Sequence, residues 1–332
     1  MSSSIEIVKY DSSFEEKWDK FIVSSSVNGT FLQSRKFLNY HPAGRFNDHS
    51  LLIMKGTNIV GLVPMNVVED GNTRKFYSHL GSTFGGILLN ANSLEIAALK
   101  EIFDRLEDYF KQQKASSVLL KQTSWLYAPK NEEIIDYFLN LYGYSVGYEI
   151  GYYVDIKKCP EDIISAYHAP KRRDYKYSLR SCQEFRELTS DEDVRKFYDV
   201  LLENYKKFET TPVHTYEEIL DLKNNKIPQN IKFYGVIFDG KVVAASMVFL
   251  FDKKVFHTQY LCCTHEAAAN MFSNAFLYTN LIRQAKISGY RYLSFGTSTL
   301  EHGRVLNYEL ARFKEAFGTS TYVNRTYSKN IA

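Results

Sequence analysis

Cysteine is scarce in this sequence, and its spacing excludes both a disulfide-rich domain and a small zinc-binding domain. The four cysteines, Cys159, Cys182, Cys262 and Cys263, form neither a disulfide framework nor a zinc-ligand pattern. The eight histidines form no His-x-x-x-His pair and no cluster with cysteine, so we predict no metal site. Buried, unreactive thiols are the expected state. Cys262 and Cys263 are adjacent in a strand-like segment, so they should point to opposite faces of a sheet.

Long apolar runs and a large net charge are also missing. The longest apolar run, VVAASMVFLF at 242–251, is too short to span a bilayer. The N-terminal segment has no basic region followed by an apolar one, as a signal peptide would. We therefore expect a cytoplasmic protein, and no membrane contact is indicated. The net charge of +3 does not by itself point to a nucleic-acid partner, and no DNA partner is expected.

What the sequence does contain is length, aromatic rings and a repeated pattern. With 332 residues the chain is long for one hydrophobic core, so two domains are expected. The 25 tyrosines and 23 phenylalanines suit clefts that contact partly polar ligands, although most of them should fill cores. Apolar residues at helical spacing predict amphipathic helices near 14–22, 94–113, 194–205 and 306–317.

Strand-like segments separated by turns occupy residues 49–82 and, in the same arrangement, residues 230–263. Each block leads into a helix and then into one more strand, at 116–123 in the first half and at 290–299 in the second. The order strand–strand–strand–helix–strand therefore occurs twice, although the two copies are barely similar in sequence. A repeat of pattern at this scale predicts two related domains.

We predict an α/β (α+β) protein with one domain at 1–155 and a second at 156–332. Each domain should be a mixed, mostly antiparallel sheet flanked by helices. In this order the last hairpin strand and the final strand are neighbours that can splay at one end and open a cleft beside a helix N-terminus. The loop Gly296-Thr297-Ser298-Thr299 follows the final strand of the second copy, so it should lie at that cleft.

Several segments together resemble the GNAT-like Fem family, whose members carry two N-acetyltransferase-type domains. They are GTFLQSRKFL, KRRDYKYSLR, HTQYLCC, SGYRYLSFGTST and LNYELARFKEAFG, and their order spans most of the chain. The resemblance implies tandem GNAT-like domains and transfer of an aminoacyl group from charged tRNA to an amine of a cell-wall precursor. Similar GNAT-type acyltransferases occur among surface-polysaccharide biosynthesis proteins.

The resemblance also implies site residues. The family's Arg-x-x-x-Tyr pair, which binds the phosphate-bearing part of the acceptor, falls on Arg173 and Tyr177. The two would share a helix face, and Arg suits phosphate, but from the spacing alone a solvated basic helix is the better explanation. The family's strand tyrosine matches Tyr260, and its Phe-Lys pair near the donor carbonyl matches Phe313 and Lys314.

Lys314 borders the predicted apolar face that Leu310 and Phe317 mark, so two interpretations are open. A lysine there can extend its ammonium to water while its stem packs, or it can reach into the cleft. In the cleft its charge would stabilise the oxyanion that acyl transfer to an amine creates. We expect the cleft, with Gly296 to Ser298 and Asn307 lining the same pocket as substrate-binding residues.

Two departures from the family pattern bear on the donor. Members that use coenzyme A carry a glycine-rich pyrophosphate segment, which here reads THEAAANMFSNAFLYTNL and has no glycine. The helical arm that some bridge enzymes use is missing as well, which weakens the inference about tRNA. In the first domain the family's lysine is replaced, and His41 is the nearest substitute.

We therefore expect no tightly bound cofactor and leave two acyl donors open, acyl-CoA and aminoacyl-tRNA. The expected partner is a small-molecule or lipid-linked envelope precursor. One alternative is an acetyl-CoA-dependent N-acetyltransferase acting on a nucleotide sugar. Another is a relative of the same fold that only binds its ligand. The oligomeric state and the catalytic base are not predicted.

Overall fold

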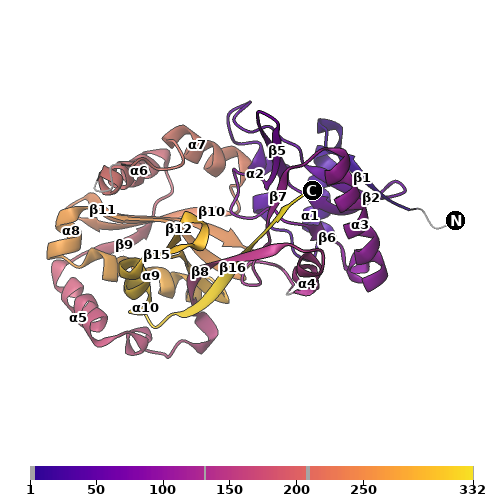
Figure 1. Ribbon diagram of the computed structural model, residues 1–332. Helices are drawn as coiled ribbons and strands as arrows, with labels where there is room; N and C mark the ends of the chain where they lie inside the picture. The colour runs from indigo at the N-terminus through magenta and orange to yellow at the C-terminus, as the bar shows by residue number, and fades with distance from the viewer. Residues whose placement is uncertain (1–3, 131, 207–209, 332) are drawn as a thin grey trace. The chain divides into compact units, whose positions relative to one another are not determined.

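The computed structural model describes residues 4–130, 132–206 and 210–331, and the chain divides into two compact units (Figure 1). The first unit contains residues 1–149 and 323–332, and the second contains residues 150–322. The predicted boundary at 155/156 lies at the end of a strand that both units share. The assignment of the last ten residues to the second domain differs from this division, because their strand adds to the first unit.

The first unit holds two groups of paired strands. One group has the order β1-β2-β3-β6 and the other the order β4-β5-β7-β16. The strands are β1 (Ile5–Lys9), β2 (Leu51–Lys55), β3 (Asn58–Val63), β4 (Met65–Asp70), β5 (Thr73–Ser78), β6 (Leu88–Leu89), β7 (Ser117–Lys121) and β16 (Ser320–Asn330). The predicted second strand of the hairpin is in fact two, β3 and β4, in different groups. Pro64 separates them, because proline has no N–H to continue a ladder.

Helix α3 (Ile96–Gln112) connects β5 to β7 and makes them a parallel pair. Its apolar face, including Phe103 and Phe110, packs on buried strand residues such as Phe76 and Val118. A parallel pair needs a crossover of this kind. The first copy of the predicted order is therefore confirmed, apart from the extra strand at Pro64.

In the second unit the strand order is β8-β13-β12-β11-β10-β9. The strands are β8 (Ser145–Asp155), β9 (Glu184–Glu187), β10 (Ile231–Phe238), β11 (Lys241–Phe251), β12 (Val255–Cys263) and β13 (Tyr292–Thr297). The main helices are α5 (Ala169–Ser178), α6 (Asp191–Lys206), α7 (Tyr216–Asp221), α8 (His265–Asn270), α9 (Ser273–Ile287) and α10 (Tyr308–Glu315).

Helices cover both faces of these strands. Figure 1 shows α6 and α7 on one side and α5, α9 and α10 on the other. This is why Cys262 and Cys263 are both buried although they point to opposite faces. Helix α9 joins β12 to β13 as a parallel pair, so the second copy of the order is confirmed too. The fold is therefore the predicted α/β (α+β) class.

No helix among the described residues is both long and apolar enough to cross a membrane.

Candidate active site

The strands β12 and β13 separate soon after they begin. Their parallel pairing covers only Val255–His257 and Tyr292–Ser294, whereas β12 continues to Cys263. Both strands are also irregular at this point. The ladder of β12 with β11 skips Gln259, and the ladder of β13 with β8 skips Phe295. Bulges bend strands and leave a residue outside the ladder, so they let the pair open. The predicted splay between these neighbours is present.

A cavity of about 220 Å³ lies at the far end of β12. Its walls come from the end of the strand, from α6 and α8, from the first turns of α9 and from α10. They include Asn204, Cys262, Cys263, Asn274, Tyr278 and Phe313. The Tyr278 ring stacks on the buried Phe317 at 4.8 Å between centroids and meets Phe313 edge to face at 5.2 Å. The wall on the α10 side is therefore aromatic and fixed by packing.

Lys314 is buried, with 3% of its surface exposed. Its Nζ donates hydrogen bonds to the carbonyl oxygens of Gly296 (3.2 Å) and Thr297 (2.5 Å), and no ion pair of this lysine is found in the described part of the chain. Burial lowers the pKa of Lys314 to about 7. An ammonium that snorkels to water does not fit this position. The predicted apolar face is wrong in the same place, since Lys314 is buried and Leu310 is exposed.

The predicted loop after β13 contacts Lys314 through two of its carbonyl groups. Gly296 has φ of +71°, a conformation that glycine adopts without strain. Ser298 is 1% exposed, and its hydroxyl has no hydrogen-bond partner among the described residues, nor has that of Thr299. Burying a hydroxyl without a hydrogen-bond partner costs folding free energy. A ligand that supplied the partner would remove this cost, so the two hydroxyls are candidate ligand contacts. Asn307 is occupied locally, because its Oδ1 accepts from the Leu310 N–H and caps α10.

His257 lies on the same part of the sheet. A Cβ on Gly296 would be 3.6 Å from its Cε1, and its Nε2 is 3.2 Å from the Gln259 Oε1. Burial, with a smaller contribution from the nearby charge of Lys314, lowers the pKa of His257 to about 4. The ring is therefore neutral at pH 7. Gln259 was not singled out from the sequence, because nothing in the sequence marks the bulge that contains it.

Tyr260 lies apart from Lys314 on the side of the sheet that α6 covers. Its hydroxyl is 2.8 Å from Nδ1 of the buried His214, and burial raises its pKa. Tyr260 is not among the described residues that line the cavity. The ring of Tyr205 lies 6.4 Å from its ring, and the neighbouring Asn204 belongs to the cavity wall. Tyr260 is thus one layer behind the cavity.

Arg173 and Tyr177 are both exposed on α5, as their spacing predicted. The Tyr177 ring packs 5.6 Å from that of Phe272, the residue before α9. Among the described residues, neither Arg173 nor Tyr177 contacts Lys314. A different α5 residue, Lys171, reaches the cavity wall, with its Nζ 4.8 Å from the centre of the Phe313 ring. Sequence reasoning did not single out Lys171.

His41 belongs to the first unit, where it packs on Tyr40 with ring centroids 3.9 Å apart. Its Nε2 is 3.1 Å from the carbonyl oxygen of Gly81. A Cβ at position 81 would lie 1.9 Å from that nitrogen, so the contact requires glycine. The glycine-rich stretch LGSTFGG therefore serves close packing at this residue.

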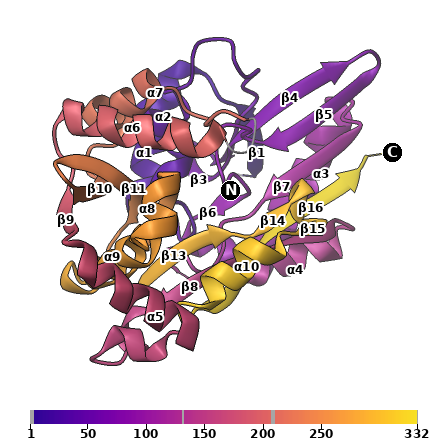
Figure 2. The same cartoon turned by 90° about the vertical axis from the view of Figure 1, so that its left-hand side faces the viewer.

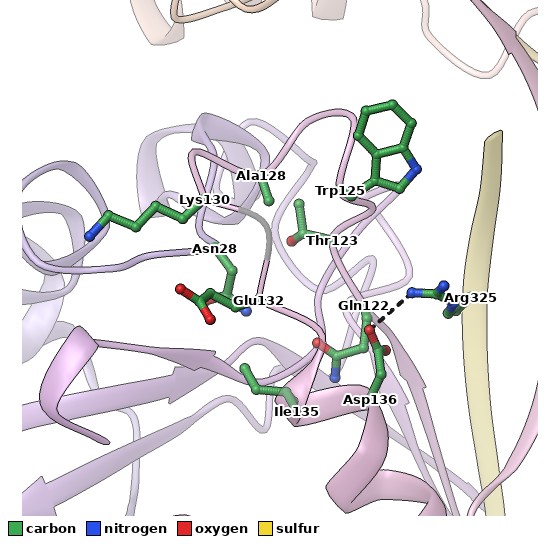
Figure 3. Close-up of a pocket in the computed structure, with 10 residues that line it drawn as sticks. All are labelled: Asn28, Gln122, Thr123, Trp125, Ala128, Lys130, Glu132, Ile135, Asp136 and Arg325. Atoms are coloured by element: carbon green, nitrogen blue, oxygen red, sulfur yellow. Dashed lines mark hydrogen bonds and ion pairs between the residues drawn. The ribbon is translucent and has the colours of Figure 1, made fainter. Parts of the chain in front are cut away.

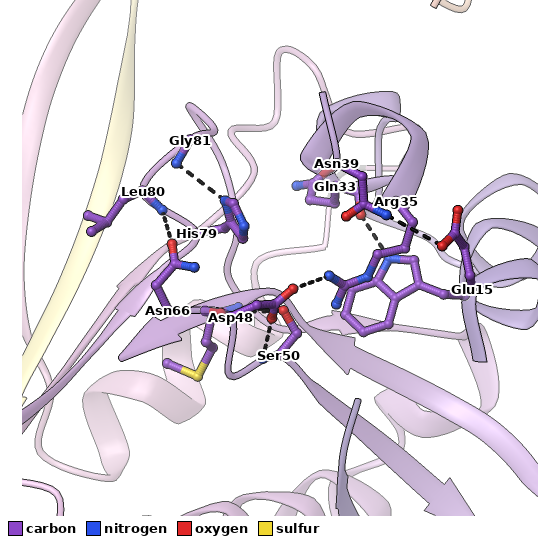
Figure 4. A network of polar contacts seen from close by, with 12 residues as sticks. Glu15, Gln33, Arg35, Asn39, Asp48, Ser50, Asn66, His79, Leu80 and Gly81 are labelled. Atoms are coloured by element: carbon purple, nitrogen blue, oxygen red, sulfur yellow. Dashed lines mark hydrogen bonds and ion pairs between the residues drawn. The ribbon is translucent and has the colours of Figure 1, made fainter. Parts of the chain in front are cut away.

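A polar network lies beside His41 (Figure 4). The guanidinium of Arg35 is completely buried, forms an ion pair with Asp48 and lies between the rings of Tyr10 (3.5 Å) and Trp18 (4.1 Å). Burial lowers the pKa of the neighbouring His79 to about 4. The Arg35 guanidinium is too buried to receive a substrate, whereas Asp48 keeps about 34% of its side-chain surface exposed.

Figure 3 shows a smaller cavity in the first unit, between Asn28, the end of β7, helix α4 (Ile134–Leu141) and Arg325 of β16. Arg325 donates to Asp136 at 3.1 Å across it. Its volume of about 20 Å³ suits one water molecule. The cavity beside Phe313 is therefore the better candidate for a substrate site.

Comparison with known proteins agrees with this geometry. Residues 169–314 match the sequence model of a family described as acetyltransferase (GNAT) domain, and this segment runs from α5 to Lys314. Over this segment the second unit is therefore similar to GNAT acetyltransferase domains, and its fold is GNAT-like. No curated protein sequence matches the chain.

Solved structures with a similar fold match the chain over both units. FemX has a TM-score of 0.68 at 10% identity, with 97% of this chain and 96% of that chain covered. The C-terminal domain of a putative lysylphosphatidylglycerol synthetase from Agrobacterium fabrum has 0.61 at 11% identity, with 96% and 93% covered. A tandem GNAT protein from the clavulanic acid biosynthesis pathway has 0.56 at 9% identity, with 99% of each chain covered. At such identities the likeness shows the fold.

Proposed function

We propose that the protein transfers an acyl or aminoacyl group to an amine of a cell-envelope precursor linked to peptidoglycan or to a surface polysaccharide. The observation that carries this proposal is the buried Lys314, which the carbonyl oxygens of Gly296 and Thr297 hold and which follows Phe313 of the cavity wall in α10. Lys314 and this loop are not themselves among the described residues that line the cavity. The Fem-like fold and the names of two similar structures, FemX and a lysylphosphatidylglycerol synthetase, support an envelope-linked acceptor.

In the proposed reaction the donor carbonyl lies in the opening between β12 and β13. The acceptor amine forms a C–N bond to the carbonyl carbon, the C–S or C–O bond of the donor breaks, and the amine proton leaves to solvent or to the leaving group. Negative charge collects on the carbonyl oxygen in between, and a fixed donor stabilises it. Lys314 has three N–H donors and uses two on the loop, which leaves one for that oxygen.

The residues before α9 do not form the glycine-rich cradle that a coenzyme A pyrophosphate would need. They form α8 instead, and Thr264 caps that helix by accepting from the Ala267 N–H. The residue after α8, Met271, is also held in place, because the Gln183 side chain donates to its carbonyl oxygen at 3.0 Å. We therefore propose that the donor is recognised mainly through its acyl end, and derive no step through the pyrophosphate.

A second candidate is an N-acetyltransferase that uses acetyl-CoA on a nucleotide sugar. The description of the matched family, an acetyltransferase domain, favours it. A third candidate, an inactive ligand-binding relative, fits the missing glycines but not a lysine held in the interior without a carboxylate partner among the described residues. Burying such a lysine lowers the stability of the fold. Proteins retain destabilising buried charges mainly at functional sites.

The decisive experiment is a single-turnover transfer assay with labelled donors and amine acceptors. Aminoacyl-tRNA and acetyl-CoA are each combined with an amino-sugar nucleotide and with a peptidoglycan precursor peptide. The proposal expects transfer to one acceptor that falls in Lys314→Met and persists in Lys286→Met, an exposed lysine at the end of α9. Transfer that is equally fast in both variants contradicts the proposed site, and no transfer from any donor favours the ligand-binding relative.

A further inference from the structure

Positive charge is concentrated on helix α5 and on the turn that follows it, η6 (Leu179–Ser181). Residues 169–181 carry five basic side chains and one acidic one, a net charge of +4, whereas the whole chain has only +3. The neighbouring helices do not offset this charge, since α9 has two basic and no acidic residues and α10 has two of each. The net charge of the whole chain therefore does not reveal this strongly basic segment.

Most of this charge faces away from the protein interior. Tyr175 and Ser178 form the buried side of α5, where the Tyr175 hydroxyl accepts from Arg283 of α9 at 2.6 Å. In the described part of the chain the one ion pair of the segment joins Lys171 to Asp174 at 3.1 Å. The other four cations have no carboxylate partner among these residues, and they recur at helical spacing: Arg172, Arg173, Lys176 and Arg180. They form one basic stripe, in which Arg172 is half-buried and the others are exposed.

Two apolar side chains flank the basic stripe at the surface. Tyr177 and Leu179 are both exposed, and the Arg180 guanidinium lies 4.8 Å from the centre of the Tyr177 ring. A basic helix with exposed aromatic and aliphatic residues is typical of a segment that lies on a membrane surface. The charge by itself would also suit the phosphates of a nucleic acid, so a second feature has to distinguish the two partners.

That feature is a short hairpin, β14 (Thr299–Leu300) and β15 (Val305–Leu306), which leads into α10. Leu300 and Val305 are cross-strand partners, so their side chains lie on the same face, and both are exposed. Tyr308 and Leu310, in the first turn of α10, are exposed as well. Single apolar residues on a surface are ordinary, whereas four large ones within residues 300–310 indicate a contact surface.

Figure 2 shows α5 and α10 side by side, with the β14–β15 hairpin beyond α10. The N–H of His168, just before α5, donates to the Ala316 carbonyl after α10 at 3.0 Å, and the Lys171 Nζ lies 5.4 Å from the centre of the Phe317 ring. The basic stripe and the exposed apolar group thus belong to adjoining elements of one unit. A nucleic acid would use only the basic stripe. A bilayer would use both, because it offers anionic headgroups and hydrocarbon.

We propose that this surface docks the protein on an anionic lipid bilayer. The surface consists of the basic stripe, the β14–β15 hairpin and the first turn of α10. The cations of the stripe would bind the phosphate groups of the headgroups, and Leu300 and Val305 would enter the boundary between headgroups and acyl chains. Docking needs neither an acyl donor nor an acceptor, so it does not depend on the function proposed above.

The test measures binding of the full chain to lipid vesicles by sedimentation. The vesicles contain phosphatidylcholine alone or with about 30% phosphatidylglycerol, at about 0.1 M and about 0.5 M salt. We expect saturable binding to the anionic vesicles at the lower salt concentration. Binding should be at least about tenfold weaker at the higher salt concentration or to the neutral vesicles, because the headgroup contacts are then screened or missing. No binding to the anionic vesicles, or equal binding to both kinds, overturns the proposal.

A matched pair of double variants tests the basic stripe. Lys176→Gln/Arg180→Gln should weaken binding to the anionic vesicles by roughly 25-fold, at about fivefold for each cation. Arg195→Gln/Lys226→Gln removes the same charge from α6 and from the segment after α7, on the other side of the sheet (Figure 1), and should leave binding unchanged. Equal binding by the two double variants contradicts the proposal.

A second pair tests the hairpin. Leu300→Ser should weaken binding by about fivefold, whereas Val213→Ser, before α7, should not, although Val213 is the more exposed residue (66% against 55%). All four variants change side chains at the surface, so their melting temperatures should stay near that of the wild type. An uncharged tRNA is titrated in parallel. If tRNA binds more tightly than the vesicles, or if Leu300→Ser binds vesicles as well as Val213→Ser does, the proposal of a bilayer is wrong.

Discussion

Replacing Lys314 with methionine removes one charge from the candidate active site and little else. The unbranched methionine side chain fills nearly the same space as the lysine stem, so the packing of α10 should be kept. The carbonyls of Gly296 and Thr297 lose a donor, but a buried ammonium that opposes folding is removed at the same time. These effects on stability have opposite signs. We expect a small change in melting temperature.

The effect on turnover should be large. A single donor to the oxyanion is worth roughly 2.7–4 kcal/mol, which corresponds to about 10² to 10³ in rate. The pKa of about 7 adds a pH signature, because only the ammonium form supplies this contact. Above pH 7 the wild type loses about a factor of ten in its charged fraction per pH unit. The ratio of wild-type to Lys314→Met kcat/KM should therefore be greatest near pH 6 and fall above pH 7.

Taking a ratio is useful because deprotonation of the acceptor amine affects both proteins equally and cancels. The assay is single-turnover acyl transfer from pH 6 to pH 9, with Lys286→Met as the control for loss of a positive charge. A ratio within about threefold of one at pH 6, as a neutral surface change would give, removes Lys314 from the site. A large ratio that stays constant across this pH range would show instead that the mutation acts through geometry.

Three further outcomes are expected. The unfolded chain holds the Lys314 proton to about pH 10.4, while the folded chain releases it near pH 7. The free energy of unfolding of the wild type should therefore rise between these pH values, by up to about 1.4 kcal/mol per pH unit, and that of Lys314→Met should not. Parallel profiles of unfolding free energy against pH for the two proteins, measured with urea, would contradict the burial of Lys314. Ser298→Ala removes an unpaired buried hydroxyl, so stability should stay the same or rise by about 1 kcal/mol while KM rises; a loss above about 1 kcal/mol would mean that the hydroxyl is paired. Calorimetry with free coenzyme A should show no low-micromolar 1:1 complex. Such a complex mapped to residues 270–287 would place the acetyl-CoA-dependent N-acetyltransferase ahead of the first proposed function.

The repeated order of elements was predictable from the sequence because it is written in local periodicity and turn residues. The loop after β13 was found in the same way, whereas Arg173 and Tyr177 were named through the family resemblance. Pro64 was visible too, but its effect on the strand was overlooked. These features depend on neighbours in the chain, which is where sequence patterns are informative.

The environment of Lys314 could not be derived in that way. The burial of Lys314 depends on hydrogen bonds to the carbonyls of Gly296 and Thr297, which belong to an earlier loop. An amphipathic helix pattern, in addition, assigns every lysine to the polar face. Tyr260 was placed at the site by resemblance, yet the bulge at Gln259 and the contact with His214 set its position. Both depend on tertiary structure, which overrides local preference.

The discontinuity of the first unit has a consequence for how the chain matures. Strand β7 pairs with β5 on one side and with residues 326–330 of β16 on the other, where Tyr327 completes the core and Lys329 binds Glu107 at 2.6 Å. During synthesis these residues emerge from the ribosome after the whole of the second unit. Until then β7 is an open edge, whereas the second unit already has nearly all of its residues. The unit that is synthesised first is thus completed only after the second unit has been synthesised. A fragment that ends at residue 155 should therefore aggregate unless a peptide of residues 320–332 is supplied.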